Sequence, residues 1–335
     1  MESSEQRWIR PGDWLDVVRH EYLRDFIRPG GAAAKLVVPI ESSDCGIVLD
    51  GLRSLADQEG FAFAAVDAAT TKVHLIDRLF HAVAAQIPWK ALAGSFARDL
   101  LAEAGYRLPD DQADLSLDKL AGFNERDRNL LGQEINRLLE KALLRDYGIC
   151  QEFRFAMIEL CREALGQGAL PEGVVEEWLR GELRLVSAMK PCLVFQKIAR
   201  HNARHMLLSL AHWLPLTGKS GLILALDISR YTVEKRPKEP DGTFYYSRPA
   251  MFDAYEVVRQ LIDGTDDAER CLVVVLSSPD FLSSDRRGLQ SYEALQLRVD
   301  DTEVFDRRRP NPLSTLVRIS NAAEPLGLSQ EREES

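Results

Sequence analysis

Apolar and strand-favouring residues form short runs along this chain. Longer stretches separate these runs, and in them the apolar residues recur at helical spacing. Five such runs occur, at 35–38, 61–66, 221–227, 271–276 and 315–319. Short apolar runs of this kind are typical of strands buried on both faces of a sheet. Helical spacing appears between them, as in 13–27 and 249–263. Strands that alternate with helices imply right-handed crossovers, so the sequence predicts an α/β fold with a parallel five-stranded sheet between helices.

A long helical region interrupts the series of strands. Helices follow one another there, with breaks at positions such as Pro88, Pro109 and Pro191. We therefore expect a first part of the α/β core at 13–71, a large helical insertion at 72–214, a second part of the core at 215–322 and a disordered polar tail at 323–335.

Composition narrows the class of protein. The net charge of −10 opposes binding of nucleic acid by the whole surface, although a local basic patch could still contact phosphates. No apolar run approaches the roughly 20 residues of a membrane helix, and the first residues do not resemble a secretion signal, so we expect a cytoplasmic protein. The five cysteines form no CxxC pair, which argues against a zinc ribbon or a disulfide framework.

The loop after the first strand, 39–46, is where a parallel sheet of this type would bind phosphates. Ligands bind outside the carboxyl ends of the strands, and a phosphate-binding loop (P-loop) needs glycines, a lysine and a hydroxyl at the start of a helix. This loop has one late glycine, no lysine and two acids, of which Asp44 is interpreted as the N-cap of the next helix. Ser42 and Ser43 are its candidate nucleotide contacts. The sequence thus predicts a P-loop-like fold with a degenerate loop, and weak or absent ATP binding.

Two further strand ends carry candidate nucleotide contacts. Asp227 ends a buried strand, as a magnesium-binding Walker B acid does, although a capping or turn role is equally open. The next residue is Ile228, where many such ATPases carry a glutamate that activates water. Ser277 ends the neighbouring strand, where it is either a sensor of the γ-phosphate or simply the end of the strand.

The tetrapeptide 217–220, Thr-Gly-Lys-Ser, contains part of a Walker A sequence but lies between a helix and a strand. A P-loop needs the reverse order, strand then loop then helix. We therefore interpret it as a helix C-cap turn around Gly218.

Two basic clusters are candidates for contact with nucleic acid or a partner. In a predicted helix at 195–213, one face carries Lys197, Arg200 and Arg204, and a solvated or salt-bridged face is the alternative. The second cluster precedes the last strand and consists of Arg307, Arg308 and Arg309, where a solvated turn is equally open.

Other polar and aromatic groups yield no defined site. Histidines 201, 205 and 212 share a helix face without a completing carboxylate or cysteine, so no metal site is predicted. The aromatic group 244–246 lies in a charged loop, either as a docking element or packed onto the sheet.

Several segments resemble the BrxD-like P-loop proteins of bacterial BREX phage-exclusion systems. The resemblance extends over about 14–318 and rests on residues 22–38, 144–147, 152–154, 221–227, 253–256 and 286–289. It implies an AAA-like ATPase fold, with ATP and magnesium as the cofactors, in a defence system that works with helicases, methyltransferases or other DNA-handling proteins. Asp227 matches the Walker B acid of that family, and Arg298 is a candidate sensor or finger arginine.

Three hypotheses follow. The leading one is an accessory subunit that acts by protein assembly, possible oligomer formation and DNA contact, with no membrane association. The second is an ATPase that uses unconventional phosphate contacts, and the third is a DNA-binding module that does not read sequence.

Overall fold

The computed structural model describes residues 8–109, 115–236, 242–300 and 311–323. It divides into two compact units, which are described separately. The sheet unit comprises 1–79 and 221–335, and the helical unit comprises 80–220.

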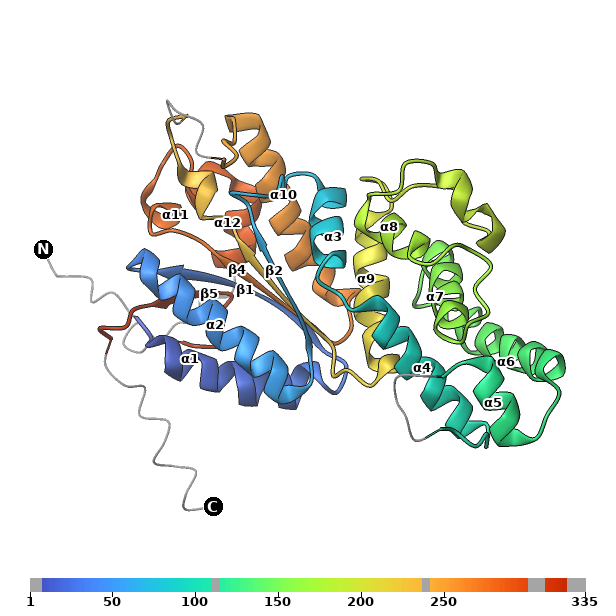
Figure 1. Ribbon diagram of the computed structural model, residues 1–335. Coiled ribbons are helices and arrows are strands. Elements are labelled where there is room, and N and C mark those ends of the chain that lie inside the picture. Colours follow the sequence, from blue (N-terminus) through green and yellow to red (C-terminus); the bar gives the residue numbers. More distant parts are fainter. Residues whose placement is uncertain (1–7, 110–114, 237–241, 301–310, 324–335) are drawn as a thin grey trace, which may run out of the picture. The chain divides into compact units, whose positions relative to one another are not determined.

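The described part of the sheet unit contains five strands, and all of their pairings are parallel (Figure 1). The strands are β1 (Ala32–Pro39), β2 (Ala62–Asp67), β3 (Leu222–Asp227), β4 (Cys271–Leu276) and β5 (Leu316–Ile319). Their spatial order is β2-β3-β4-β1-β5. The predicted α/β fold with a parallel five-stranded sheet is therefore confirmed, and it is consistent with a P-loop-like fold.

Helices cover both faces of this sheet (Figure 1). On one face lie α1 (Pro11–Val17), η1 (Val18–Ile27) and α2 (Ser42–Glu59), and on the other lie α10 (Arg248–Asp263) and α12 (Glu293–Asp300). Every second strand residue points to the α2 side, as the period of two requires, and Val37, Ala225 and Val274 join the same buried cluster. Gly60 ends α2 with φ of 75°, a left-handed C-cap that glycine adopts without strain.

The helix predicted at 13–27 changes its hydrogen-bond pattern half-way. Its second half, η1, is a π-helix of ten residues, a rare form in which bonds run between residues five apart. Arg19 and Arg24 are five residues apart, and both reach Glu59, the last residue of α2. Arg28 bonds the same carboxylate at 3.1 Å, so three arginines surround one buried acid.

Short elements connect the strands of the sheet unit. They are η4 (Ser229–Thr232), η5 (Gly264–Asp266), α11 (Asp280–Ser283) and η6 (Leu289–Ser291). The chain passes from the sheet unit to the helical unit within α3 (Ile76–Ala84). Tyr246, in the long loop after β3, is buried, and its hydroxyl donates to the carbonyl oxygens of Ala68 and Thr71 at 2.9 and 2.7 Å. Tyr246 is therefore packed inside the sheet unit, against the turn that follows β2.

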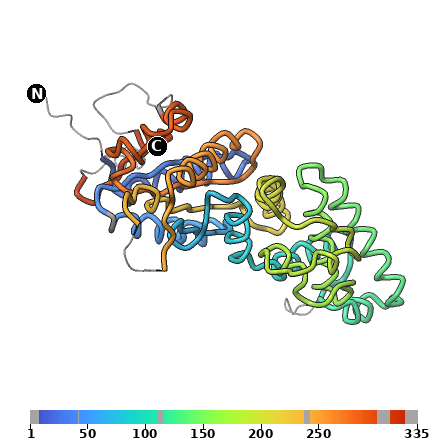
Figure 2. The backbone as a smooth tube through the Cα atoms, turned by 90° about the horizontal axis from the view of Figure 1, so that it is seen from above, coloured from blue at the N-terminus to red at the C-terminus, as the bar shows by residue number. Residues whose placement is uncertain are grey.

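The helical unit is a succession of helices around its own core (Figure 2). They are α4 (Trp89–Glu103), α5 (Leu117–Asn124), α6 (Arg128–Leu143), α7 (Gln151–Ala164), α8 (Val174–Arg180), η2 (Val186–Cys192), α9 (Ala203–Trp213) and η3 (Leu214–Thr217). Trp89, Phe153 and Trp213 are buried and lie within about 6 Å of one another, ring centre to ring centre. Gly218 caps η3 with φ of 83°, which confirms that 217–220 is a turn. Among the described residues, no helix is long and apolar enough to cross a bilayer.

Candidate functional site

The link between β1 and α2 consists of only two residues, Ile40 and Glu41. Pro39 still pairs with Ile319 of β5, and α2 begins at Ser42. The N–H of Ile40 donates to the carbonyl oxygen of Ile319 at 3.0 Å, so this group is engaged in the sheet. A phosphate-binding loop surrounds its ligand with several backbone N–H groups, and a two-residue link cannot provide that enclosure.

Carboxylates occupy the start of α2. Glu41 is exposed at the N-cap position, where its side chain makes no capping bond, and the Ser43 hydroxyl donates to it at 3.4 Å. Asp44 is buried in the first turn, and its N–H donates to the carbonyl oxygen of Glu41 at 3.0 Å. The predicted N-cap role of Asp44 is therefore wrong, because α2 starts at Ser42, three residues earlier than that role requires. The Asp44 charge still favours the positive helix end. The side chain of Ser42 is outside what the structure describes.

Asp227 and Asp67 end neighbouring strands in register with each other. Each carboxylate accepts a hydrogen bond from the backbone N–H two residues on, at 2.8 Å from Ser229 and 2.7 Å from Ala69. This is the local turn geometry that aspartate favours after a strand. Burial raises the pKa of Asp227, and the Asp67 charge adds to the effect while the Ser229 bonds oppose it. Asp227 therefore serves the turn and also remains a strand-end acid that could contact a ligand.

The end of β4 comes close to the first turn of α2. Ser277 is buried, and its N–H donates to the carbonyl oxygen of Val37 at 3.1 Å. The Cys45 sulfur lies 3.6 Å from the Ser277 carbonyl oxygen. Burial raises the pKa of Cys45 to about 12, and the charges of Asp227 and Asp44 contribute. The fold thus brings Asp227, Ser277 and the turn that contains Ser43 to one edge of the sheet.

A polar hollow of about 450 Å³ at the same edge was not predicted from the sequence. It is lined by Thr232, Glu234, Asp280, Ser283, Ser284, Asp285 and Arg286. The Thr232 and Ser278 hydroxyls are 2.8 Å apart beside it. The run of serines and acids that directly follows β4 was the signal that could have indicated it.

Ile228 is buried and its N–H donates to the Leu276 carbonyl oxygen at 2.8 Å, so an apolar side chain occupies the position after Asp227.

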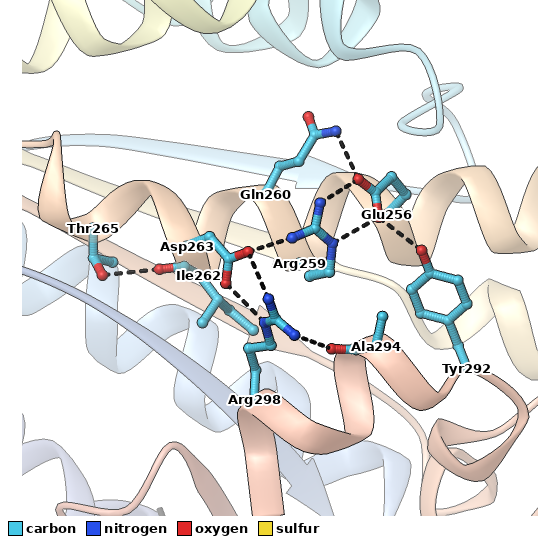
Figure 3. A network of polar contacts seen from close by, with 9 residues as sticks. All are labelled: Glu256, Arg259, Gln260, Ile262, Asp263, Thr265, Tyr292, Ala294 and Arg298. Atoms are coloured by element: carbon cyan, nitrogen blue, oxygen red, sulfur yellow. Dashed lines mark hydrogen bonds and ion pairs between the residues drawn. The ribbon is translucent and has the colours of Figure 1, made fainter. Parts of the chain in front are cut away.

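Arg298 does not join this edge. It ion-pairs with Asp263 at 3.1 Å, within a network that also contains Arg259, Glu256 and Tyr292 (Figure 3). Asp263 ends α10, whose start follows the carboxyl end of β3, so this pair lies toward the amino ends of the strands. The position of Arg298 is explained by its contact with Asp263.

The structure describes the first predicted basic cluster, at Lys197, Arg200 and Arg204, but not the second. The helix predicted at 195–213 begins only at Ala203, because the Asn202 side chain accepts the N–H of Ala199 at 2.7 Å and holds a turn there. Lys197 and Arg200 therefore precede α9, while Arg204 lies on it, and the shared helix face is wrong. Arg307, Arg308 and Arg309 lie outside the described residues.

The histidines of this region are not gathered. His212 Nε2 lies 3.1 Å from the Asp146 carboxylate, and His201 lies 3.4 Å from the side-chain oxygen of Gln196. Within the described residues, no group of three or more histidines, cysteines or acids could hold a metal ion.

A family model described as "BREX system ATP-binding protein BrxC/D" matches residues 113–324, more than half of the chain. The chain belongs to this BrxC/D family. It is therefore a member of a family of ATP-binding proteins of the BREX defence system. A search of curated proteins and a search of solved structures each gave no match.

The range matched by the family model includes only part of the candidate site of this BrxC/D protein. Asp227 and Ser277 lie inside it, whereas β1, the link and α2 lie before residue 113. ATP is the ligand that the family name implies, and the residues at the link do not fit its phosphates. Glu41 is exposed there, Asp44 follows within a turn, and the segment 39–46 contains no lysine or arginine. Carboxylates beside a triphosphate repel it, so the link lacks the charge complement that phosphate binding requires.

Proposed function

We propose that this BrxC/D family protein is an accessory subunit of an anti-phage defence system that acts mainly by protein assembly. Its nucleotide site is degenerate and does not drive strong ATP hydrolysis. The two-residue link between β1 and α2, with Glu41 exposed at the helix start, carries this proposal.

Ile228 supports the same proposal. Hydrolysis needs a group that accepts a proton from water, and the residue after the strand-end acid is a buried isoleucine. This feature lowers the expected rate of ATP turnover.

A second candidate function is an ATPase with unconventional phosphate contacts. Its support is the convergence of Asp227, Ser277 and the first turn of α2 at one sheet edge. Ligands of parallel sheets bind at this edge, so the location suits a nucleotide even though the link does not.

Calorimetric titration of the full chain with ATP and magnesium separates the two candidates. We expect no saturable heat at about 1 mM ATP, which corresponds to a binding free energy weaker than about −4 kcal/mol. Asp227→Asn and Asp67→Asn are a matched pair, because both acids end strands and accept the same kind of backbone bond. Micromolar binding that Asp227→Asn abolishes and Asp67→Asn retains would establish the ATPase candidate instead.

Phage plating with the complete defence system tests the same proposal in cells. Asp227→Asn keeps the size of the side chain and an oxygen acceptor for the Ser229 N–H. We expect it to leave protection unchanged, whereas a required ATPase would lose protection without any loss of protein level.

A further inference from the structure

Three large apolar side chains are exposed on one short segment of the helical unit. Leu185 is 70% exposed, Leu193 is 53% exposed and Phe195 is 63% exposed. A single exposed apolar residue is ordinary, but a group of three within eleven residues is a feature of binding surfaces. We refer to residues 184–200 as the 184–200 surface.

The backbone of the 184–200 surface is held in place from both sides. The Lys197 ammonium donates to the carbonyl oxygen of Arg184 at 2.9 Å, which joins the two ends of the segment. The indole N–H of Trp178, a buried residue of α8, donates to the carbonyl oxygen of Gln196 at 3.0 Å. Leu185 follows Arg184 and Phe195 precedes Gln196, so these bonds place both apolar side chains beside one fixed stretch of backbone.

Leu193 adds a backbone that is unfavourable for its side chain. It follows η2 with φ of 60° and ψ of 26°, the left-handed conformation that glycine adopts at little cost. Two other non-glycine residues with positive φ, Glu125 and Arg270, have polar side chains. A leucine in this conformation bears both strain and exposure, and strained residues of this kind cluster at functional sites.

A groove borders the same surface. Its volume is about 390 Å³, and it is lined by Glu177, Glu182, Leu183, Arg184, Leu185 and Ala188. Leu185 therefore forms part of a concave site as well as of the exposed apolar group. An apolar side chain of a partner would find a partly enclosed position there.

The 184–200 surface is basic, whereas the protein as a whole is acidic. Residues 184–200 contain four basic residues and no acid, in a chain whose net charge is −10. All four basic side chains are exposed: Arg184, Lys190, Lys197 and Arg200. Exposed basic and apolar side chains on one segment are complementary to a partner that carries acidic groups beside apolar side chains.

We propose that the 184–200 surface binds an acidic segment of a partner protein through leucine-like or aromatic side chains. This inference rests on the proposed function, because it names the surface by which the subunit assembles. A protein segment is favoured over single-stranded nucleic acid because two of the three exposed groups are leucines, which offer no ring for a base to stack on.

Co-purification of the full, tagged chain with the other proteins of its defence system tests this proposal. Phe195→Asp replaces an exposed aromatic side chain of the surface with a charge. We expect at least about a tenfold loss of retained partner, as for an interface hot spot. Leu130→Asp is the matched control, because Leu130 is 61% exposed on α6 of the same unit. It should retain the partner as the wild type does.

Leu193→Gly distinguishes binding from folding. Glycine fits the left-handed backbone and removes the side chain, so the melting temperature should rise while partner retention falls. A variant that was merely misfolded would show a lower melting temperature together with lower partner retention. Lys197→Glu combined with Arg200→Glu should weaken retention most at low salt, because the attraction to acidic groups is screened as salt increases.

Each contrary outcome has a separate meaning. Retention of the partner by both Phe195→Asp and Leu193→Gly would overturn this surface and leave the assembly function standing. Failure of the wild type to retain any protein of the system would overturn the assembly function as well. A third measurement is fluorescence anisotropy with a 20-nucleotide poly-dT probe. If Phe195→Asp abolished DNA binding but still retained the partner, that result would assign the surface to nucleic acid.

Discussion

Two acids of the sheet unit, Glu59 and Asp227, respond in opposite ways to burial. Burial by itself raises the pKa of both carboxylates. Hydrogen bonds and charge from Arg24 and Arg19 lower the pKa of Glu59 to about 2, whereas Asp227 meets a backbone N–H and the like charge of Asp67 and keeps a raised pKa. At Glu59 the hydrogen bond from Arg24 is the largest effect and outweighs burial, whereas at Asp227 burial is the largest effect.

The opposite pKa shifts distinguish a structural acid, Glu59, from an acid of the candidate site, Asp227. Glu59 joins α2 to η1, and its charge is compensated within the protein. The Asp227 charge is opposed by its surroundings, which is typical of positions where a ligand or a reaction uses the group. We expect mutations to have opposite signs in the two places.

The largest effect is expected for Glu59→Ala. It leaves three arginines without their shared acceptor and removes the bonds that fix the end of α2. The arginines are partly exposed, so solvent compensates some of the loss, and we expect destabilisation of about 2 kcal/mol in urea unfolding at pH 7. Asp57→Ala, an exposed acid of the same helix, is the control and should change little.

The same acid predicts a pH dependence. Because the pKa of Glu59 is lowered from 4.5 to about 2 on folding, its contribution is fully present above about 4.5 and is lost as pH falls toward 2. Wild type and Glu59→Ala should therefore converge in stability in that window. Parallel curves across the window would contradict the role of the arginines.

A smaller effect is expected in the network of Figure 3. Arg259 bonds both Glu256 and Asp263 and lowers the pKa of Glu256 to about 2. Arg259→Ala should cost about 1 kcal/mol in the same assay, since these side chains are partly exposed. Arg298→Ala removes only the contact with Asp263 among these acids and should cost less. An equal or larger cost for Arg298→Ala would show that the two arginines are not ranked by their contacts.

The smallest effect, and one of opposite sign, is expected for Asp227→Asn. The raised pKa means that the folded protein disfavours the carboxylate, so stability falls as pH rises through the ordinary pKa of aspartate toward the raised one. Asparagine removes that dependence, and we expect a gain of about 0.5 kcal/mol at pH 7 with no gain at pH 3. Destabilisation at pH 7 would show that the Asp227 charge supports the fold, as the Glu59 charge does.

The sheet was predictable from sequence because its strands are buried on both faces. A run such as 271–276 has one simple explanation, and the interruptions at Gly60 and Gly218 mark ends of helical elements through their backbone conformation. The strand order was not predictable, since a sequence gives only the succession of elements. The π-helix was also missed, because its residues have the composition of an ordinary helix.

The candidate site was predictable only in part. Asp227 and Ser277 follow from their positions at strand ends, but the short β1–α2 link depends on Pro39 remaining in the sheet with Ile319, a pairing distant in sequence. The start of α9 was misplaced because the Asn202 side chain competes with the helix for a backbone N–H, and helical spacing of basic residues does not reveal such competition. The exposed conformation of Leu193 likewise has no sequence signal.

The π-helix η1 determines which side chains of one helix meet the end of α2. In an α-helix, residues five apart point about 140° away from each other, so Arg19 and Arg24 would not face Glu59 from adjacent turns. The wider turn aligns them without any change of residue type. The contact between η1 and α2 through Glu59 therefore depends on the π-helical hydrogen-bond register as much as on the arginines themselves.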